Sequence, residues 1–157
     1  MRASQRLKEL GLELPKPTPG KLLPAVQVGE LVFTSGNTSP QKGKVGRDLT
    51  VEEAYQGARE AALRCLGAVE ATIGSIDRVV RVVKLLGFVN CAEGFSNTPQ
   101  VMHGATDLLV EIFGEEAGRH ARSAIGVYQL PGDAAVEVEL IVQVQAEVQP
   151  SLETMTA

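Results

Sequence analysis

The chain has 157 residues, of which 44% are hydrophobic and 22% charged, an ordinary composition for a globular protein. Its net charge of −4 argues against nucleic acid as the main partner, because phosphate binding needs clustered lysine and arginine. No segment reaches the ~20 apolar residues of a membrane span, and no apolar run typical of a signal peptide occurs near residue 1. Cys65 and Cys91 lack metal-ligand spacing. We therefore expect one cytoplasmic domain with reduced thiols, no membrane partner and no metal or other cofactor.

The first 20 residues are predicted to be an N-terminal helix and a proline-rich arm. Leu7 and Leu10 lie at helical spacing within residues 3–12. Three prolines in the segment 14–20 exclude a helix or a central strand there. We expect this arm to pack on the outer face of the main domain, residues 21–146, or at the rim of a pocket. Residues 147–157 are predicted to be a loose tail.

The main domain is predicted to begin with a β-hairpin over residues 26–34 that turns at Gly29-Glu30. A polar loop follows over residues 37–49. It carries a small basic cluster that either attracts an anionic ligand or RNA or is an ordinary solvated loop: Lys42, Lys44 and Arg47.

A helix and a central strand are predicted next. Thr50 and Glu53 form a capping box, and the helix behind them has an alanine-rich stripe that includes Cys65 and stops at Gly74. Residues 79–86 are β-branched and apolar on both faces, which is typical of a strand covered on both sides.

The second helix is predicted to begin at Asn97 or Thr98, with Pro99 in its first turn, and to end at Gly114. His103 lies on it between core positions, either as an ordinary helix residue or as a pocket residue. Cys91, before this helix, is expected in an exposed turn, where a nucleophilic role would need a neighbouring base.

The last two predicted strands carry the most informative residues. Arg122 stands at the start of an apolar strand, and residues 136–145 alternate with Glu137 and Glu139 on the more polar side. A guanidinium is costly to leave unpaired in apolar surroundings, so Arg122 requires an anion. That anion is either a glutamate across a β pair, Glu137 or Glu139, or the carboxylate of a ligand.

The predicted order is β-β-α-β-α-β-β, an α+β sandwich with two helices on one face of a mixed sheet. Two helices cover only one face. We therefore expect the other face to meet a partner subunit, sheet against sheet.

An ordered set of segments resembles the Rid family, also called the YjgF or endoribonuclease L-PSP family, over about residues 22–145: Val32–Asn37, the alanine-rich helix, Asp77–Val82, Ala121–Ser123, Leu130-Pro131 and Val136–Glu139. The resemblance implies a chorismate-mutase-like fold, a homotrimer whose sheets form a central barrel, and small-molecule pockets between subunits. In the RidA branch, the arginine that matches Arg122 grips the carboxylate of an enamine or imine. Hydrolysis then gives a 2-keto acid and ammonia.

The resemblance and the residue pattern together suggest the site. Arg122 would fix a carboxylate, Glu139 would handle a water or a proton, and Gly36 would let substrate approach the backbone. His120 is expected near the pocket rim, where it would titrate near neutral pH. The candidate residues are Arg122, Glu139, Gly36, Ala124, His120 and His103.

Three features depart from RidA. Leu22-Leu23 stand where RidA proteins have a tyrosine, and Ala124 stands where many have a cysteine. A helix asparagine of RidA has no clear match, although His103 or Asn97 lies near that region. The chain is therefore similar to a subfamily neighbouring RidA, and anion binding carries over better than deamination.

Three functions follow from these observations. The chain is an enamine/imine deaminase, a binder of small carboxylates without turnover, or an endoribonuclease as the family label says. The missing tyrosine hydroxyl favours the second. The acidic composition and the lack of a paired-histidine motif make the third the weakest.

Overall fold

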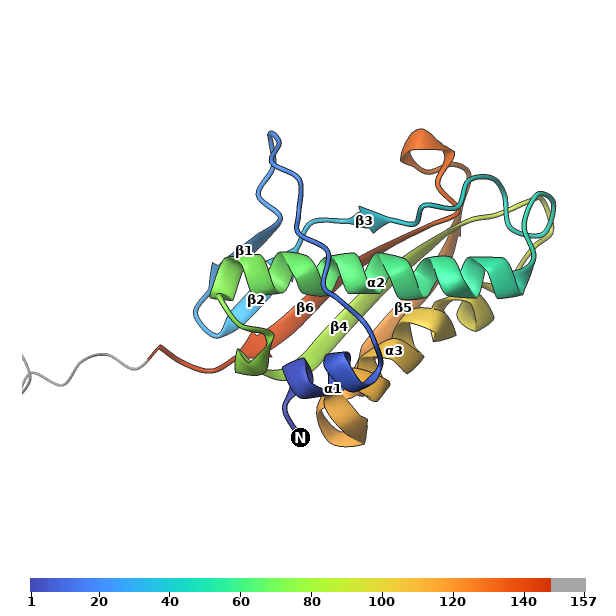
Figure 1. Ribbon diagram of the computed structural model, residues 1–157. Helices are drawn as coiled ribbons and strands as arrows, with labels where there is room; N and C mark the ends of the chain where they lie inside the picture. The colour runs from blue at the N-terminus through green and yellow to red at the C-terminus, as the bar shows by residue number, and fades with distance from the viewer. Residues whose placement is uncertain (148–157) are drawn as a thin grey trace, which may run out of the picture.

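The computed structural model describes residues 1–147 as a mixed six-stranded sheet with two long helices on one face (Figure 1). The strands are β1 (Ala25–Val28), β2 (Leu31–Thr34), β3 (Asn37–Thr38), β4 (Val79–Asn90), β5 (Ala121–Val127) and β6 (Val136–Val144). The helices are α1 (Ala3–Glu9), α2 (Val51–Ile73) and α3 (Thr98–Gly118), with short 3₁₀ turns at Ile76–Arg78 and Pro131–Asp133. The predicted α+β architecture is confirmed. The predicted tail, apart from Glu147, lies outside the described residues.

Helix α2 has the predicted ends. The Thr50 hydroxyl accepts a hydrogen bond from the Glu53 amide at 3.2 Å, and Gly74 closes the helix with a left-handed φ of 88°. The alanine-rich stripe is fully buried. Helices α2 and α3 cross closely at Gly104, where an added Cβ would lie 2.0 Å from the Tyr55 carbonyl oxygen.

The sequence predicted that helix α3 ends at Gly114, but the helix continues beyond this residue. Gly114 adopts φ 82° and ψ 170°, which breaks the helix, and a further turn continues to Gly118. That turn folds against the helix, since a Cβ on Gly118 would lie 2.6 Å from the Leu109 carbonyl oxygen. The chain then enters β5 through His120.

The strand order β1-β2-β6-β4-β5 corrects the predicted pairing of the last two strands. Strand β5 runs parallel to β4, to which α3 connects it, and β6 lies between β2 and β4. A longer connection therefore joins β5 to β6. It spans residues 128–135 and crosses the end of β4. Parallel neighbours require a long crossover, which α3 provides here.

The N-terminal helix and arm lie on the outer surface of the helix layer (Figure 1). Leu7 is buried, and the Ser4 amide and the Arg6 side chain donate to Asp77 at 2.8 Å and to the Glu111 carbonyl at 2.9 Å. Further on, the Pro15 carbonyl rests directly on α2, at the point where Gly67 leaves room.

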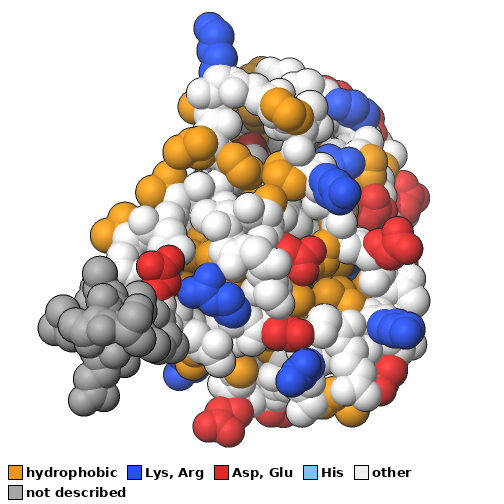
Figure 2. All heavy atoms as spheres, turned by 60° about the vertical axis from the view of Figure 1, so that its left-hand side comes forward, with side chains coloured by type: hydrophobic (Ala, Val, Ile, Leu, Met, Phe, Trp, Pro, Cys, Tyr) orange, Lys and Arg blue, Asp and Glu red, His pale blue; other side chains and the backbone are white. Residues whose placement is uncertain are grey.

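The second face of the sheet is not covered by any helix among the described residues. Along β6 the helix-facing residues are buried, whereas those between them stay partly exposed. Several apolar side chains of the hairpin and of β5 remain 37–64% exposed: Val26, Val28, Leu31, Phe33 and Ile125. Figure 2 shows hydrophobic side chains gathered along one margin, with charged side chains dispersed elsewhere. Within residues 1–147, no helix is both long and apolar enough to cross a membrane.

Candidate functional site

Arg122 projects from β5 toward the helix layer. It is in register with Leu85 of β4, which is in register with Leu140 of β6, and both leucines are buried under the helices. Its Nη1 lies 3.0 Å from His103 Nδ1 and donates to Thr106 Oγ1 at 3.2 Å. Both partners belong to α3.

Of the two alternatives for the anion of Arg122, a cross-strand pair with Glu137 or Glu139 is wrong, because β4 separates the two strands. Among the described residues, Arg122 forms no salt bridge, and no hydrogen bond reaches its Nε or Nη2. Partial burial lowers the pKa of Arg122, and the charge of Asp107 opposes that shift. The result is a partly desolvated cation with one whole edge of its guanidinium unused.

His120 joins the same cluster through Thr106. Its Nε2 lies 3.1 Å from Thr106 Oγ1, and its Nδ1 lies 2.6 Å from the Gly118 carbonyl oxygen. Burial lowers the pKa of His120, and the charge of Arg122 lowers it further, against the effect of the Gly118 carbonyl. Thr106 was missed at the sequence level. Its spacing of three residues from His103, on one helix face, was the available signal.

Ala124 follows Arg122 on the same face of β5, since it is in register with Gly87 and two residues further along the strand. Its carbonyl accepts a hydrogen bond from Thr98 at 2.9 Å, at the first turn of α3. The structure therefore brings four of the six candidates, Arg122, His103, His120 and Ala124, to one region between β5 and α3.

Glu139 and Gly36 belong to the opposite face of the sheet. Glu139 is in register with Leu86 and, through it, with Ser123, so it points away from Arg122. A Cβ on Gly36 would lie 3.0 Å from the Glu137 carboxyl carbon. Partial burial raises the pKa of Glu137, and the charge of Glu139 raises it further. One chain cannot present Arg122 and Glu139 to the same small ligand.

The basic residues of the 37–49 loop are engaged internally. Lys42 donates to the Gly132 carbonyl at 2.8 Å, Arg47 pairs with Asp48 at 2.8 Å, and Lys44 donates to Asn90 at 2.9 Å. These contacts support the interpretation of the cluster as part of an ordinary loop.

Neither cysteine is placed as a nucleophile. Cys65 is buried and its Sγ lies 3.2 Å from the Val138 carbonyl oxygen, and burial raises its thiol pKa to about 12. Cys91 is half-buried rather than exposed, with its Sγ beside Gly126. Within residues 1–147, no three side chains of His, Cys, Asp or Glu gather closely enough to hold a metal ion.

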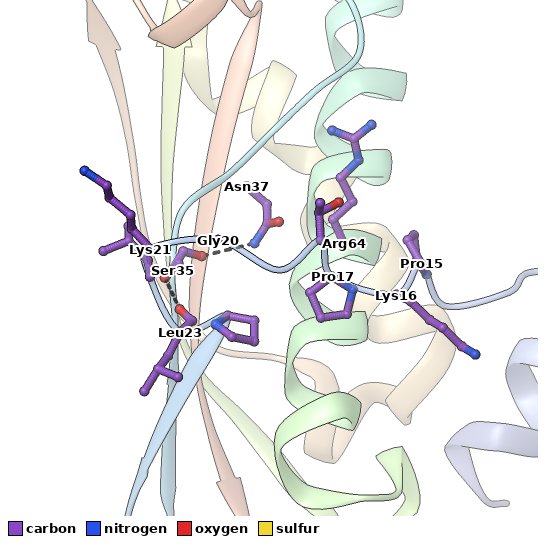
Figure 3. A pocket seen from close by; sticks show the side chains of 12 residues that line it. Pro15, Lys16, Pro17, Gly20, Lys21, Leu23, Ser35, Asn37 and Arg64 are labelled. Carbon is purple, nitrogen blue, oxygen red and sulfur yellow. Dashed lines mark hydrogen bonds between the residues drawn. The ribbon is translucent and has the colours of Figure 1, made fainter.

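A cleft of ≈ 660 Å³ lies under the N-terminal arm (Figure 3). Arg64 of α2 and Asn37 line it opposite the arm, and Ser35 donates to the Leu23 carbonyl at its edge at 2.7 Å. None of the six candidate residues lines this cleft. Leu22 does line it, and 78% of its surface is exposed.

Comparison with known proteins gives three informative relatives. Protein TCP17 of Trypanosoma cruzi is 50% identical over 101 residues, which are 64% of this chain and 63% of that protein, so the chain spans less than two thirds of its length. A 2-iminobutanoate/2-iminopropanoate deaminase of Dermatophagoides farinae is 29% identical over 77% of this chain and 84% of the deaminase. The crystal structure of a putative endoribonuclease from Shewanella oneidensis superposes with a TM-score of 0.86 at 32% identity, over 92% of this chain and 100% of that one.

The family model described as YjgF/chorismate_mutase-like, putative endoribonuclease, matches residues 4–144. The match covers α1 and the proline-rich arm as well as the sheet and both long helices. With this match and the fold in agreement, the chain belongs to the Rid (YjgF) family.

Proposed function

We propose that this protein binds a small carboxylate between subunits of a homotrimer, with Arg122 as its anchor, and hydrolyses an enamine or imine to a 2-keto acid and ammonia. The observation that carries the proposal is the unused edge of the Arg122 guanidinium. Nε–H and Nη2–H on that edge point in parallel, which matches the two oxygens of a carboxylate. The name of the mite relative, an iminobutanoate/iminopropanoate deaminase, supports this reaction class.

The chemistry requires an anchor and a group that handles protons. With the carboxylate held by Arg122, water adds to the imine carbon and the nitrogen takes up a proton. The C–N bond then breaks, and ammonia leaves the 2-keto acid. Glu139 is the proposed group that positions the water or moves the proton. Because Glu139 and Arg122 lie on opposite faces of one sheet, the two would come from different subunits.

The proposed homotrimer also accounts for the uncovered face of the sheet. Five apolar side chains there or at its hairpin edge keep more than a third of their surface exposed in one chain. Contact with identical subunits would bury them in a closed ring.

The test is the release of 2-oxobutanoate from 2-iminobutanoate, the imine that an amino acid oxidase generates in situ from 2-aminobutanoate. Arg122→Ala should abolish the acceleration, and Arg122→Lys should restore little of it, because an ammonium lacks the two-pronged edge. Arg119→Ala is the matched control, since the Arg119 side chain is 76% exposed and lies three residues away. Unchanged turnover in an assembled Arg122→Ala protein would refute the proposal.

A second candidate is carboxylate binding without turnover, for regulation or protection. The apolar Leu22 at the position of the RidA tyrosine favours it, since no hydroxyl is available there. Thermal stabilisation by 2-oxobutanoate in a protein that does not accelerate keto acid release would identify this function. The endoribonuclease named in the family description would require RNA cleavage that co-elutes with the assembled protein and survives metal removal.

A further inference from the structure

The Arg122 guanidinium is held from one side. Nη1 carries two hydrogens, and two acceptors lie within hydrogen-bond distance: His103 Nδ1 at 3.0 Å and Thr106 Oγ1 at 3.2 Å. An arginine has no acceptor atom, so the imidazole nitrogen and the hydroxyl oxygen must both accept. Nη1 is thereby saturated by α3, and only the edge formed by Nε and Nη2 is left for a ligand.

The direction of the next bonds is also fixed. The Gly118 carbonyl can only accept, so His120 Nδ1 carries the hydrogen of the 2.6 Å contact. With Nδ1 protonated, Nε2 of the neutral ring accepts from the Thr106 hydroxyl at 3.1 Å. The hydroxyl can then accept from Arg122 and donate to His120 at once. The resulting chain runs from Arg122 through Thr106 and His120 to Gly118.

The other charged groups nearby leave this arrangement intact. Asp107, beside Thr106 on α3, accepts a hydrogen bond from the Tyr55 hydroxyl of α2 at 2.6 Å. Asp107 and Arg122 form no salt bridge among the described residues, so the Arg122 charge is not neutralised. Arg119, before β5, is directed to Glu115 at 3.9 Å.

We propose that Thr106 and His103 are positioning residues, which fix the rotation of the Arg122 guanidinium so that its Nε–Nη2 edge faces the ligand, and that His120 orients the Thr106 hydroxyl. The proposal rests on the proposed carboxylate site. Its consequence is selectivity for planar anions with two parallel oxygens. Without these contacts, Arg122 keeps its charge but rotates freely and binds as a point charge.

The experiment pairs a variant that loses the hydroxyl with one that retains it. Thr106→Val keeps the side-chain volume and removes the acceptor, whereas Thr106→Ser restores it. For 2-oxobutanoate binding measured by calorimetry, we expect Thr106→Val to raise Kd about tenfold, as for the loss of one hydrogen bond to a charged group. Thr106→Ser should stay within about twofold of the unmodified protein. His103→Leu and His103→Asn form the same comparison at the second contact, because the asparagine oxygen can accept in place of Nδ1.

A second readout needs no ligand. The ¹⁵N order parameter of the Arg122 Nε–H should fall in Thr106→Val and recover in Thr106→Ser. If Thr106 has a purely structural role, Thr106→Val and Thr106→Ser should lower Tm equally and leave the order parameter and Kd unchanged. That result would overturn the inference. If the unmodified protein does not bind 2-oxobutanoate and Arg122→Ala changes nothing, the carboxylate site itself is wrong. If Arg122→Ala abolishes binding but Thr106→Val is silent in both readouts, only the positioning role fails.

Discussion

The two faces of the sheet differ in how far a single chain buries them. On the helix face, α2 and α3 bury the helix-facing residues of β6, and Arg122 donates two hydrogen bonds to acceptors on α3. On the open face, the same strand presents Glu137 and Glu139 beside apolar residues that stay partly exposed. Folding of one chain therefore completes the helix face, whereas the open face and the proposed site would be completed only by the proposed assembly.

The largest loss of stability is expected from a substitution in the helix layer. Gly104→Ala would place a Cβ 2.0 Å from the Tyr55 carbonyl oxygen, and backbone cannot yield as a side chain can. Overpacking of this kind costs about 3 kcal/mol of unfolding free energy. Denaturant unfolding measures it, with Gly20→Ala as the control because no atom lies within 4 Å of its added Cβ. Equal stability of the two variants would show that the helices are not packed this closely.

A charged substitution on the open face tests whether this face is buried between subunits. Phe33→Asp should dissociate the assembly while leaving the fold intact, because Phe33 is 40% exposed in one chain and would be buried between subunits. Sedimentation velocity and circular dichroism report the two properties. Ala71→Asp, on the exposed side of α2, is the matched control. A Phe33→Asp protein of unchanged mass would contradict the proposed interface.

Substitution of Arg122 distinguishes a role in ligand binding from a role in the stability of the fold. Arg122→Ala should cost only about 1 kcal/mol of unfolding free energy, because His103 and Thr106 are half-exposed and water can replace the guanidinium. Thermal unfolding with and without 2-oxobutanoate measures both the stability and the response to ligand, and the response should vanish. A loss of several kcal/mol would instead mark Arg122 as a structural residue.

The smallest effect concerns Glu137. Burial, and then the charge of Glu139, raise the pKa of Glu137. A folded-state pKa above the unfolded value stabilises the fold at low pH, and this contribution is lost as pH rises through the folded pKa. Glu137→Gln should therefore have a higher Tm than the unmodified protein at pH 7, and the difference should shrink toward pH 4. A Tm difference that is constant over this pH range would contradict the cause.

The sequence predicted the helices and strands well, but it predicted which strands pair less well. Local signals are strong for the hairpin at Gly29, the cap at Thr50 and the stop at Gly74, because each depends on a few adjacent residues. The pairing of β5 with β4 rather than β6 is not local, since a 3₁₀ turn and a crossing connection decide it. Without this pairing, a glutamate of β6 remained a possible partner of Arg122 beside a ligand carboxylate.

The candidate site was predictable only in part, for the same reason. The position of Arg122 at the start of a strand indicated an anion, but the partner helix face decides what holds the guanidinium. The sequence signal for Thr106 was its spacing of three residues from His103, and the role of His103 itself stayed open until α3 was placed over β5. The separation of Arg122 from Glu139 follows from strand register, which alternation alone does not give.

Mixing two inactive proteins tests directly whether two subunits share one site. Arg122→Ala and Glu139→Gln, each inactive alone in keto acid release, are dissociated, mixed in equal amounts and reassembled. If the site takes its arginine and its glutamate from different subunits, one site in each mixed trimer is intact. Roughly a quarter of all sites in the reassembled mixture are then intact, and activity returns to about that level. Verified mixed assemblies that remain inactive, or full activity in either variant alone, would contradict the account.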